Sequence, residues 1–257
     1  MQKFIFISLF VVLAAVAVPP NGPSHRNPAF LGAVHAVSGL VSSNALQSYL
    51  KLDDNLNDSF GDAWTDNAVS YGAGKINNAV ITTREVVDPP EAPKYINHGT
   101  DTRFDLISDW TISLWVYNQD VSVDSYILCK TTSPSDNGYT LVQLGGSTFV
   151  LYTGNSGLSQ VTSTTFGNTP QDTWCHVVIQ NVGGSTIKIK VNDGAWDSAA
   201  SSTSASNAAD IVIGCSFAQD SGLTGTVDGV SIWKRILTDA EITKLWNLGN
   251  KARPQLP

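Results

Sequence analysis

Cysteine is scarce in this chain, which has only Cys129, Cys175 and Cys215 among its 257 residues. Three thiols leave at least one unpaired, and none lies in a C-x-x-C or Cys/His spacing that would hold a metal ion. Cys129 and Cys175 fall in apolar, strand-like runs, where a free cysteine behaves as a small hydrophobic residue. The sequence therefore excludes a disulfide scaffold and predicts buried free thiols, with one bridge left open.

Charged residues are also few, at 14% of the chain, and their formal net charge is -7. No local cluster of Lys and Arg reverses this sign, so a phosphate backbone would be repelled and nucleic acid is excluded as a partner. Hydrophobic residues reach 42%, which is enough for a sizeable core. The remaining surface, rich in Ser, Thr, Asn and Gly, is typical of strands and turns in an extracellular setting.

Long apolar runs are absent except at the N-terminus, where residues 4–18 are almost wholly apolar. This run is shorter than the ~20 residues that a membrane-spanning helix needs, so we expect no stable transmembrane span. Lys3 before the run and the small residues Ala15 and Ala17 at its end are typical of a signal peptide. We predict an export signal in residues 1–18. An apolar arm that stays attached and is buried in a partner is the alternative.

The rest of the chain divides into an arm, one domain and a short tail. Prolines interrupt residues 19–45, which we interpret as a linker or surface arm. Beyond them, short runs rich in Val, Ile, Thr and aromatic residues recur between turn residues. The clearest runs are 111–117, 126–130, 139–144, 148–152, 174–180, 187–191, 211–213 and 229–233. We therefore predict a single all-β domain over residues 46–253, followed by a tail at 254–257.

Local patterns refine this all-β prediction. Glycine pairs at 145–146 and 183–184 predict tight hairpins, and hence a meander of neighbouring strands. Strict alternation in 187–191 places Lys188 and Lys190 on a face turned to water. One helix is indicated near the C-terminus, where Thr238 and Glu241 form a capping box and Gly249 is expected to cap the end.

Several separated segments, in this order, resemble the laminin-G-like, concanavalin-A-like jelly-roll family. They are residues 52–59, 72–80, 104–115, 172–178, 189–194 and 225–242, and the resemblance spans about 49–248. The last segment, which contains the Val-Asp-Gly turn and the trailing helix, is the most specific. The resemblance implies a two-sheet antiparallel jelly-roll sandwich with one short C-terminal helix. It implies sugar binding, adhesion or assembly, with ligands bound at the loop rim or on a concave sheet face.

Members of this family often hold calcium with aspartate side chains from rim loops, and Asp58 and Asp228 occupy the matching motif positions. Such an arrangement suits Ca²⁺, which takes six to eight hard oxygen ligands. The alternative is that Asp58 caps a turn and Asp228 hydrogen-bonds the backbone. The resemblance thus gives a possible calcium cofactor, whose ligand spacing is not that of an EF-hand loop.

Sugar recognition needs aromatic faces for stacking and polar side chains for the hydroxyl groups. Trp64 and Trp196 fall in polar or turn sequence, and we name them with Tyr139 as candidate ligand-binding residues; Tyr71 and Tyr152 are weaker candidates. The alternative for each tryptophan is that it packs over a hairpin.

No pattern of catalytic residues is convincing. The acidic segment 85–91 has the wrong spacing for the paired carboxylates of a glycosidase and contains two prolines, so we interpret it as a loop. His176 matches a strand position of the family, and no nucleophile motif accompanies any of the four histidines. We expect a structural or surface role for each of them.

These observations favour a non-catalytic, lectin-like protein that binds a glycan or glycoprotein, secreted or displayed at a surface. The alternative is a structural protein of a virion or surface assembly, in which the jelly roll is a building block and copies form a homo-oligomer. A glycoside hydrolase of the same fold is third.

Overall fold

The computed structural model describes residues 41–87, 90–133, 137–154, 158–201 and 206–251. The predicted export signal at 1–18, most of the predicted arm at 19–45 and the tail at 254–257 lie outside these residues. The assembly alternative depends on that N-terminal segment, so the structure does not test it.

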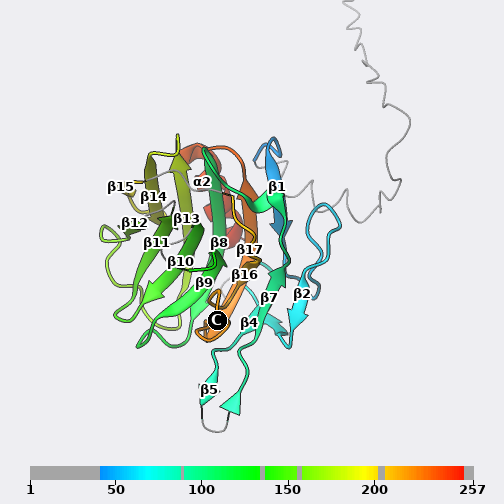
Figure 1. Ribbon diagram of the computed structural model, residues 1–257. Coiled ribbons are helices and arrows are strands. Elements are labelled where there is room, and N and C mark those ends of the chain that lie inside the picture. Colours follow the sequence, from blue (N-terminus) through cyan, green and yellow to red (C-terminus); the bar gives the residue numbers. More distant parts are fainter. Residues whose placement is uncertain (1–40, 88–89, 134–136, 155–157, 202–205, 252–257) are drawn as a thin grey trace, which may run out of the picture.

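The described chain consists of two antiparallel sheets stacked face to face, with one helix behind the larger sheet (Figure 1). The larger, eight-stranded sheet has the order β15-β14-β13-β8-β17-β4-β3, and β1 pairs with β17. Its strands are β1 (Leu46–Leu50), β3 (Ser70–Ala73), β4 (Asn78–Thr82), β8 (Trp110–Asn118), β13 (Trp174–Val182), β14 (Thr186–Val191), β15 (Asp197–Ala200) and β17 (Gly225–Trp233).

The smaller, seven-stranded sheet has the order β12-β11-β10-β9-β16-β7-β2. Its strands are β2 (Thr65–Asn67), β7 (Tyr95–His98), β9 (Ser125–Lys130), β10 (Gly138–Leu144), β11 (Thr148–Gly154), β12 (Leu158–Thr162) and β16 (Ile211–Ile213). A short 3₁₀ turn, η1 (Thr102–Phe104), precedes β8. The family resemblance predicted this two-sheet jelly roll, and the prediction is confirmed.

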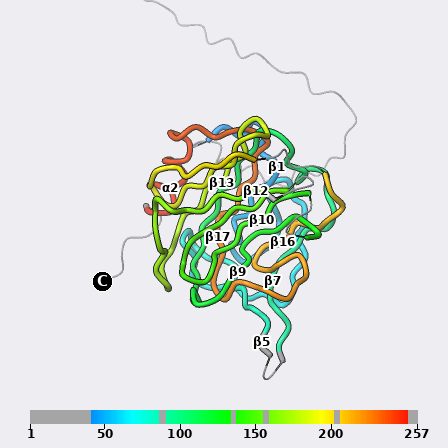
Figure 2. Tube along the Cα trace, turned by 60° about the vertical axis from the view of Figure 1, so that its left-hand side comes forward, coloured from blue at the N-terminus to red at the C-terminus, as the bar shows by residue number. Residues whose placement is uncertain are grey.

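A two-stranded hairpin, β5 (Val86–Val87) and β6 (Pro90–Glu91), projects from the end of the sandwich in both views (Figures 1 and 2). It occupies the acidic, proline-containing segment that the sequence suggested was a loop. Its strands pair only with each other, Val86 with Glu91 and Val87 with Pro90.

The main core lies between the sheets and is built by alternation along each strand. In β14, Ile187, Ile189 and Val191 point into this core, as predicted. The opposite face of β14 is not fully open to water, because Trp196 lies over it and leaves Lys190 only 9% exposed. The prediction that both lysines face water is therefore wrong for Lys190: its stem is covered by an indole ring.

The α-helix α2 (Asp239–Lys251) covers the outer face of the larger sheet. Its residues Ile242 and Leu245 pack with Val178 of β13 and Trp233 of β17. The strands β8, β13 and β17 are thereby buried on both faces, so their polar residues, such as Ser113, His176 and Asp228, are buried as well. Among the described residues, no helix is long and apolar enough to cross a membrane.

The start of α2 is confirmed, but its predicted end is wrong. Glu241 Oε2 accepts a hydrogen bond from the Thr238 amide at 2.9 Å, and the Glu241 amide donates back to the Thr238 hydroxyl at 3.3 Å. Gly249, expected to cap the helix, lies inside it, because α2 continues to Lys251. The glycine serves packing: a Cβ there would lie 2.3 Å from Cζ2 of Trp115.

All eight strands predicted from apolar runs are present, with ends shifted by at most four residues. The hairpins at 145–146 and 183–184 join β10 to β11 and β13 to β14. The three cysteines are buried and free, as expected. What local sequence did not predict is that β8 lies between β13 and β17, rather than beside β9.

Candidate functional site

The outer face of the smaller sheet carries a hollow of about 210 Å³ over β9, β10 and β11. Strand alternation creates it. Tyr139 and Leu141 of β10 point into the main core, so Thr140, Val142 and Leu144 point the other way and line the hollow. We call this site the tyrosine hollow.

Two tyrosines and a phenylalanine surround its floor. Tyr126 of β9 lies opposite Val142, and Tyr152 of β11 lies opposite Thr140. Phe217 enters from the segment that joins β16 to β17 and packs against the buried cluster under it. The lining thus combines three aromatic rings from two strands and a loop.

The polar groups at the hollow are neutral donors beside one carboxylate. Burial raises the pKa of Tyr126, and the electrostatic interactions with Cys129 and Asp124 raise it further. Burial and Asp124 also raise the pKa of Tyr152. Both phenols therefore stay protonated near neutral pH. Asp124 Oδ1 accepts a hydrogen bond from the Gly145 amide at 2.8 Å, which fixes the carboxylate at the rim.

A second hollow, of about 370 Å³, lies on the same sheet face beyond this loop. Tyr95 of β7 and Gln219 of the loop both line it, and the Tyr95 hydroxyl donates to Gln219 Oε1 at 2.6 Å. The Ser216 hydroxyl donates to Asp220 Oδ1 at 2.7 Å within the loop. The segment from 216 to 221 is therefore held as a ridge between the two hollows.

Two of the three predicted ligand-binding aromatics lie in the core. Trp64 is 4% exposed and packs edge-on against Phe104 and His98. Tyr139 is 2% exposed, and its hydroxyl donates to the Phe104 carbonyl at 3.1 Å. Neither ring has a face open to a ligand. The interpretation of Trp64 as an exposed platform is corrected by its burial, and Tyr139 is a core residue because it alternates inward.

Trp196 is half-buried, and its side chain contacts both β14 and α2. Its Nε1 donates to Asp239 Oδ1 at 2.8 Å, and the Lys188 ammonium lies 4.5 Å from its ring centroid. The packing alternative named for this tryptophan accounts for these contacts. Of the weaker candidates, Tyr152 lines the tyrosine hollow, and Tyr71 packs against the main core from the other sheet.

The two aspartates proposed for calcium lie in separate hydrogen-bonding environments. Asp58 Oδ1 accepts from the Phe60 and Asp62 amides, and its Oδ2 accepts from the Ser48 hydroxyl at 3.0 Å. Arg103 already places a guanidinium nitrogen 3.6 Å from that carboxylate. The turn-capping alternative for Asp58 describes these contacts.

Asp228 is fully buried in β17, where its Oδ2 accepts from the Ile76 amide at 2.7 Å and its Oδ1 has no partner among the described residues. Burial raises the pKa of Asp228 to about 7. In the described part of the chain, no group of three or more His, Cys, Asp or Glu side chains is placed to hold a metal. Asp58 and Asp228 therefore do not form one calcium site together. Whether the protein binds calcium at all stays a prediction.

His176 lies on the outer face of the larger sheet, under α2. Its Nε2 lies 2.7 Å from the Ser113 hydroxyl, and its ring lies 4.9 Å from that of Trp115. Burial lowers the pKa of His176 to about 3, so the imidazole is neutral. Both residues are at most 2% exposed. No substrate reaches this Ser-His pair, which agrees with a structural role for the histidine.

Sequence reasoning missed Tyr126, Asp124 and Phe217. A signal for Tyr126 exists, because it begins a predicted strand whose next residues are apolar and inward-facing. Phe217 lies on a loop, whose position no periodicity gives.

A family model described as the concanavalin A-like lectin/glucanases superfamily matches residues 92–243, more than half of the chain. The chain belongs to this superfamily. No curated protein sequence matches it. The residues that match the family model include every strand of the tyrosine hollow and the loop that carries Phe217.

Solved structures share the fold at low sequence identity. Domain 4 of AbnA, an extracellular GH43 arabinanase of Geobacillus stearothermophilus solved with arabinotriose, is 19% identical with a TM-score of 0.59; the match covers 78% of this chain and 97% of that one. The binding domain of Paraclostridial Mosquitocidal Protein 1 is 15% identical with a TM-score of 0.63. The match covers 80% of this chain and 52% of that one. The binding domain of botulinum neurotoxin DC, solved with SialylT, is 13% identical with a TM-score of 0.61. The match covers 80% of this chain and 52% of that one. This concanavalin A-like chain thus spans about half the length of the toxin binding domains.

Proposed function

We propose that this protein is a non-catalytic glycan-binding module that acts outside the cell and takes its ligand in the tyrosine hollow. The observation that carries the proposal is the combination of Tyr126, Tyr152 and Phe217 around one hollow with Asp124 at its rim. Aromatic rings bind the apolar C–H face of a sugar, and polar groups at the edge bind its hydroxyls.

The chemistry of the lining suits a neutral sugar. Two protonated phenols donate hydrogen bonds to ring or hydroxyl oxygens, and the Asp124 carboxylate accepts from sugar hydroxyls. That carboxylate would repel an anionic sugar placed beside it. At about 210 Å³ the hollow is smaller than the ~300–1,000 Å³ of sites for drug-sized ligands, so it accommodates a single sugar ring.

The experiment is a glycan array probed with the full-length protein, in calcium and again in chelator. We expect binding to neutral glycans in both conditions, because the proposed contacts to the sugar are aromatic rings, phenols and one carboxylate, none of which needs a metal ion. Tyr152→Ala is expected to weaken binding about 2- to 10-fold by removing a stacking face worth roughly 0.5–1.5 kcal/mol. Tyr152→Phe keeps the ring and loses only the hydroxyl, so it separates stacking from hydrogen bonding.

Phe60→Ala is the matched control, because Phe60 is a 47% exposed aromatic that does not line the hollow. Binding that survives Tyr126→Ala and Tyr152→Ala unchanged would move the site elsewhere on the molecule. A protein that retains no glycan in either condition would refute the function itself.

A further inference from the structure

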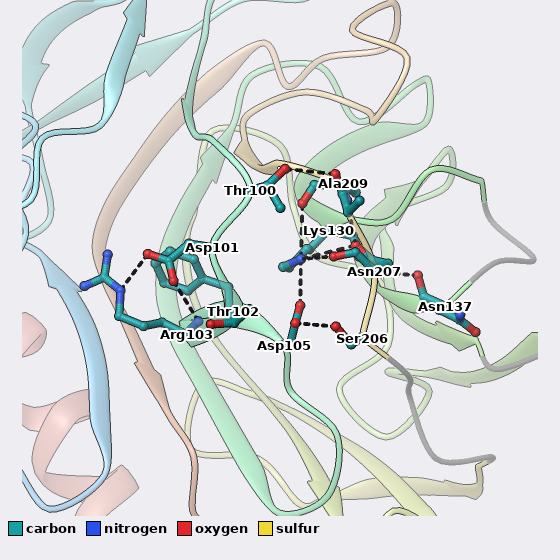
Figure 3. Close-up of polar contacts among 12 residues, drawn as sticks. Thr100, Asp101, Thr102, Arg103, Asp105, Lys130, Asn137, Ser206, Asn207 and Ala209 are labelled. Carbon is teal, nitrogen blue, oxygen red and sulfur yellow. Dashed lines mark hydrogen bonds and ion pairs between the residues drawn. The ribbon is translucent and has the colours of Figure 1, made fainter.

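A buried lysine that does not line the tyrosine hollow lies at the end of β9, opposite Tyr139 of β10. Lys130 is 1% exposed, and its Nζ is surrounded by oxygens (Figure 3). The Nζ atom lies 2.9 Å from Asp105 Oδ1, 3.2 Å from both Oδ1 and the carbonyl of Asn207, and 3.1 Å from the Ala209 carbonyl. Three side chains capable of reacting with one another, an amine, a carboxylate and an amide, therefore meet in one buried cluster.

The Asn207 amide is fixed in one orientation. Its Nδ2 donates to the Lys130 carbonyl at 3.2 Å and to the Asn137 carbonyl at 2.6 Å. Its Oδ1 accepts from the Ala209 amide at 2.9 Å as well as from Lys130 Nζ. Because two carbonyls face Nδ2, the oxygen and nitrogen of the amide cannot be exchanged. The Ala209 amide on Oδ1 is placed to stabilise negative charge that develops on this oxygen when Nζ attacks.

Asp105 lies on the other side of the lysine. Its Oδ2 accepts from the Ser206 hydroxyl at 2.5 Å, and its side chain is 9% exposed. The buried ring of Tyr139 and the carbonyl of Phe104 close this side of the cluster. A carboxylate that contacts a buried amine and is shielded from water is placed to carry protons between neighbouring groups.

The approach of these groups depends on Gly138. A Cβ at this position would lie 1.9 Å from the Lys130 carbonyl and 2.6 Å from Asn207 Nδ2. The backbone at Gly138 has φ +126, which L side chains rarely adopt. The Lys130 ammonium has three donors, and the oxygens of Asp105, Asn207 and Ala209 accept from them, which places the Asn207 amide against the amine.

We propose that Lys130 and Asn207 form an intramolecular isopeptide bond, with Asp105 as the proton carrier. Asp105 takes a proton from the Lys130 ammonium, and the neutral Nζ attacks Cγ of Asn207 while the carbonyl electrons move to Oδ1. Asp105 then gives its proton to Nδ2 and takes the remaining extra proton from Nζ. The Cγ–Nδ2 bond breaks, ammonia leaves, and it recovers the proton from Asp105 as ammonium. An ammonium and an amide thus become a new amide and an ammonium ion, with no oxidation or reduction.

The product would join two parts of the chain that are 77 residues apart. It would fasten the end of β9 to the segment that leads into β16, the strand beside it in the smaller sheet. All three cysteines are free, so the described chain has no disulfide. The isopeptide bond would be a covalent cross-link between distant parts of it.

The test is the intact mass of the purified full-length protein under denaturing conditions, followed by tryptic peptide mapping. We expect a mass lower by one ammonia and a branched peptide that joins Lys130 to Asn207, with trypsin unable to cleave at Lys130. Succinimide formation at an asparagine also releases ammonia, but it leaves the peptides linear and Lys130 cleavable. Linear peptides from the wild type, after purification and after prolonged incubation, would overturn the proposal.

Variants assign the roles, and circular dichroism reports whether each folds. Lys130→Arg and Asn207→Ser are expected to yield linear peptides only, since each removes a reacting atom. Asp105→Asn is expected to yield linear peptides with both reacting groups retained. Asp101→Asn is its matched control: Asp101 belongs to the same segment but pairs with Arg103, so the branched peptide should persist. A branched peptide in Asp105→Asn would refute the role of Asp105. The wild-type map alone decides whether the bond exists, even where a variant fails to fold.

Discussion

Gly249→Ala sets helix propensity against packing. In an ordinary helix interior this change stabilises by about 1 kcal/mol. Here the new Cβ would lie 2.3, 2.5 and 2.8 Å from Cζ2, Cε2 and Nε1 of Trp115. The indole cannot retreat easily, because it is 2% exposed, stacks on Trp246 at 5.2 Å and lies 4.9 Å from the His176 ring.

Overpacking a rigid site costs about 1–3 kcal/mol, and contacts this short on a confined ring belong at the upper end. After the gain in propensity, we expect a net loss of about 2 kcal/mol in unfolding free energy. For a domain of this size that lowers Tm by roughly 4–8 °C. Urea unfolding followed by tryptophan fluorescence, together with a thermal melt, measures both quantities.

Asn250→Ala is the control, since Asn250 is exposed in the same helix and its replacement should change stability by a few tenths of a kcal/mol in the favourable direction. A stabilised Gly249→Ala variant would show that Trp115 moves freely, and the packing explanation of this glycine would fail.

Two further predictions concern the polar interactions of Asp228 and Trp196. Burial raises the pKa of Asp228 in the folded state to about 7, so the folded protein holds a proton that the unfolded chain releases near its ordinary value of 3.8. The stability that this group contributes is full below about pH 4, falls as the pH rises and is lost above about pH 7. In urea unfolding measured between about pH 4 and pH 7, Asp228→Asn should reduce the dependence of the unfolding free energy on pH. An unchanged dependence would show that another group holds the proton. Trp196→Phe keeps a ring beside Lys188 but loses the hydrogen bond to Asp239, so it should cost about 1 kcal/mol in urea unfolding. Glycan binding should be unaffected by Trp196→Phe; a fall in array signal with normal stability would return this tryptophan to the binding site.

Local sequence patterns predicted those elements whose physics is local. The strands of the smaller sheet from β9 to β11 alternate or run apolar between glycine turns, and their pairing follows chain order. The capping box at Thr238 is likewise complete within four residues. Gly249 shows the limit of such reasoning: a glycine near a helix end has the sequence pattern of a cap, but here it leaves room for a ring from β8, more than 130 residues earlier in the chain.

The candidate site was less predictable because it depends on which face of each strand turns outward. Trp64 is surrounded by polar residues in sequence, but its ring is buried against Phe104. Tyr139 and Tyr152 are both strand tyrosines, and only their register separates a core residue from a residue that lines the hollow. Phe217 reaches the site from a loop, so the path of the β16–β17 connection had to be known first.

The position of β17 governs when the sandwich can form. This strand, the last one among the described residues, pairs with β8 along one edge, and with β4 at residues 225–227 and β1 at residues 230–233 along the other. The strands β1, β4 and β8 therefore lack this partner until β17 has been synthesised. Such distant pairings make folding slow, and a chain that stops before residue 225 would leave three open strand edges ready to aggregate. The larger sheet is consequently completed only once the chain has been synthesised through β17.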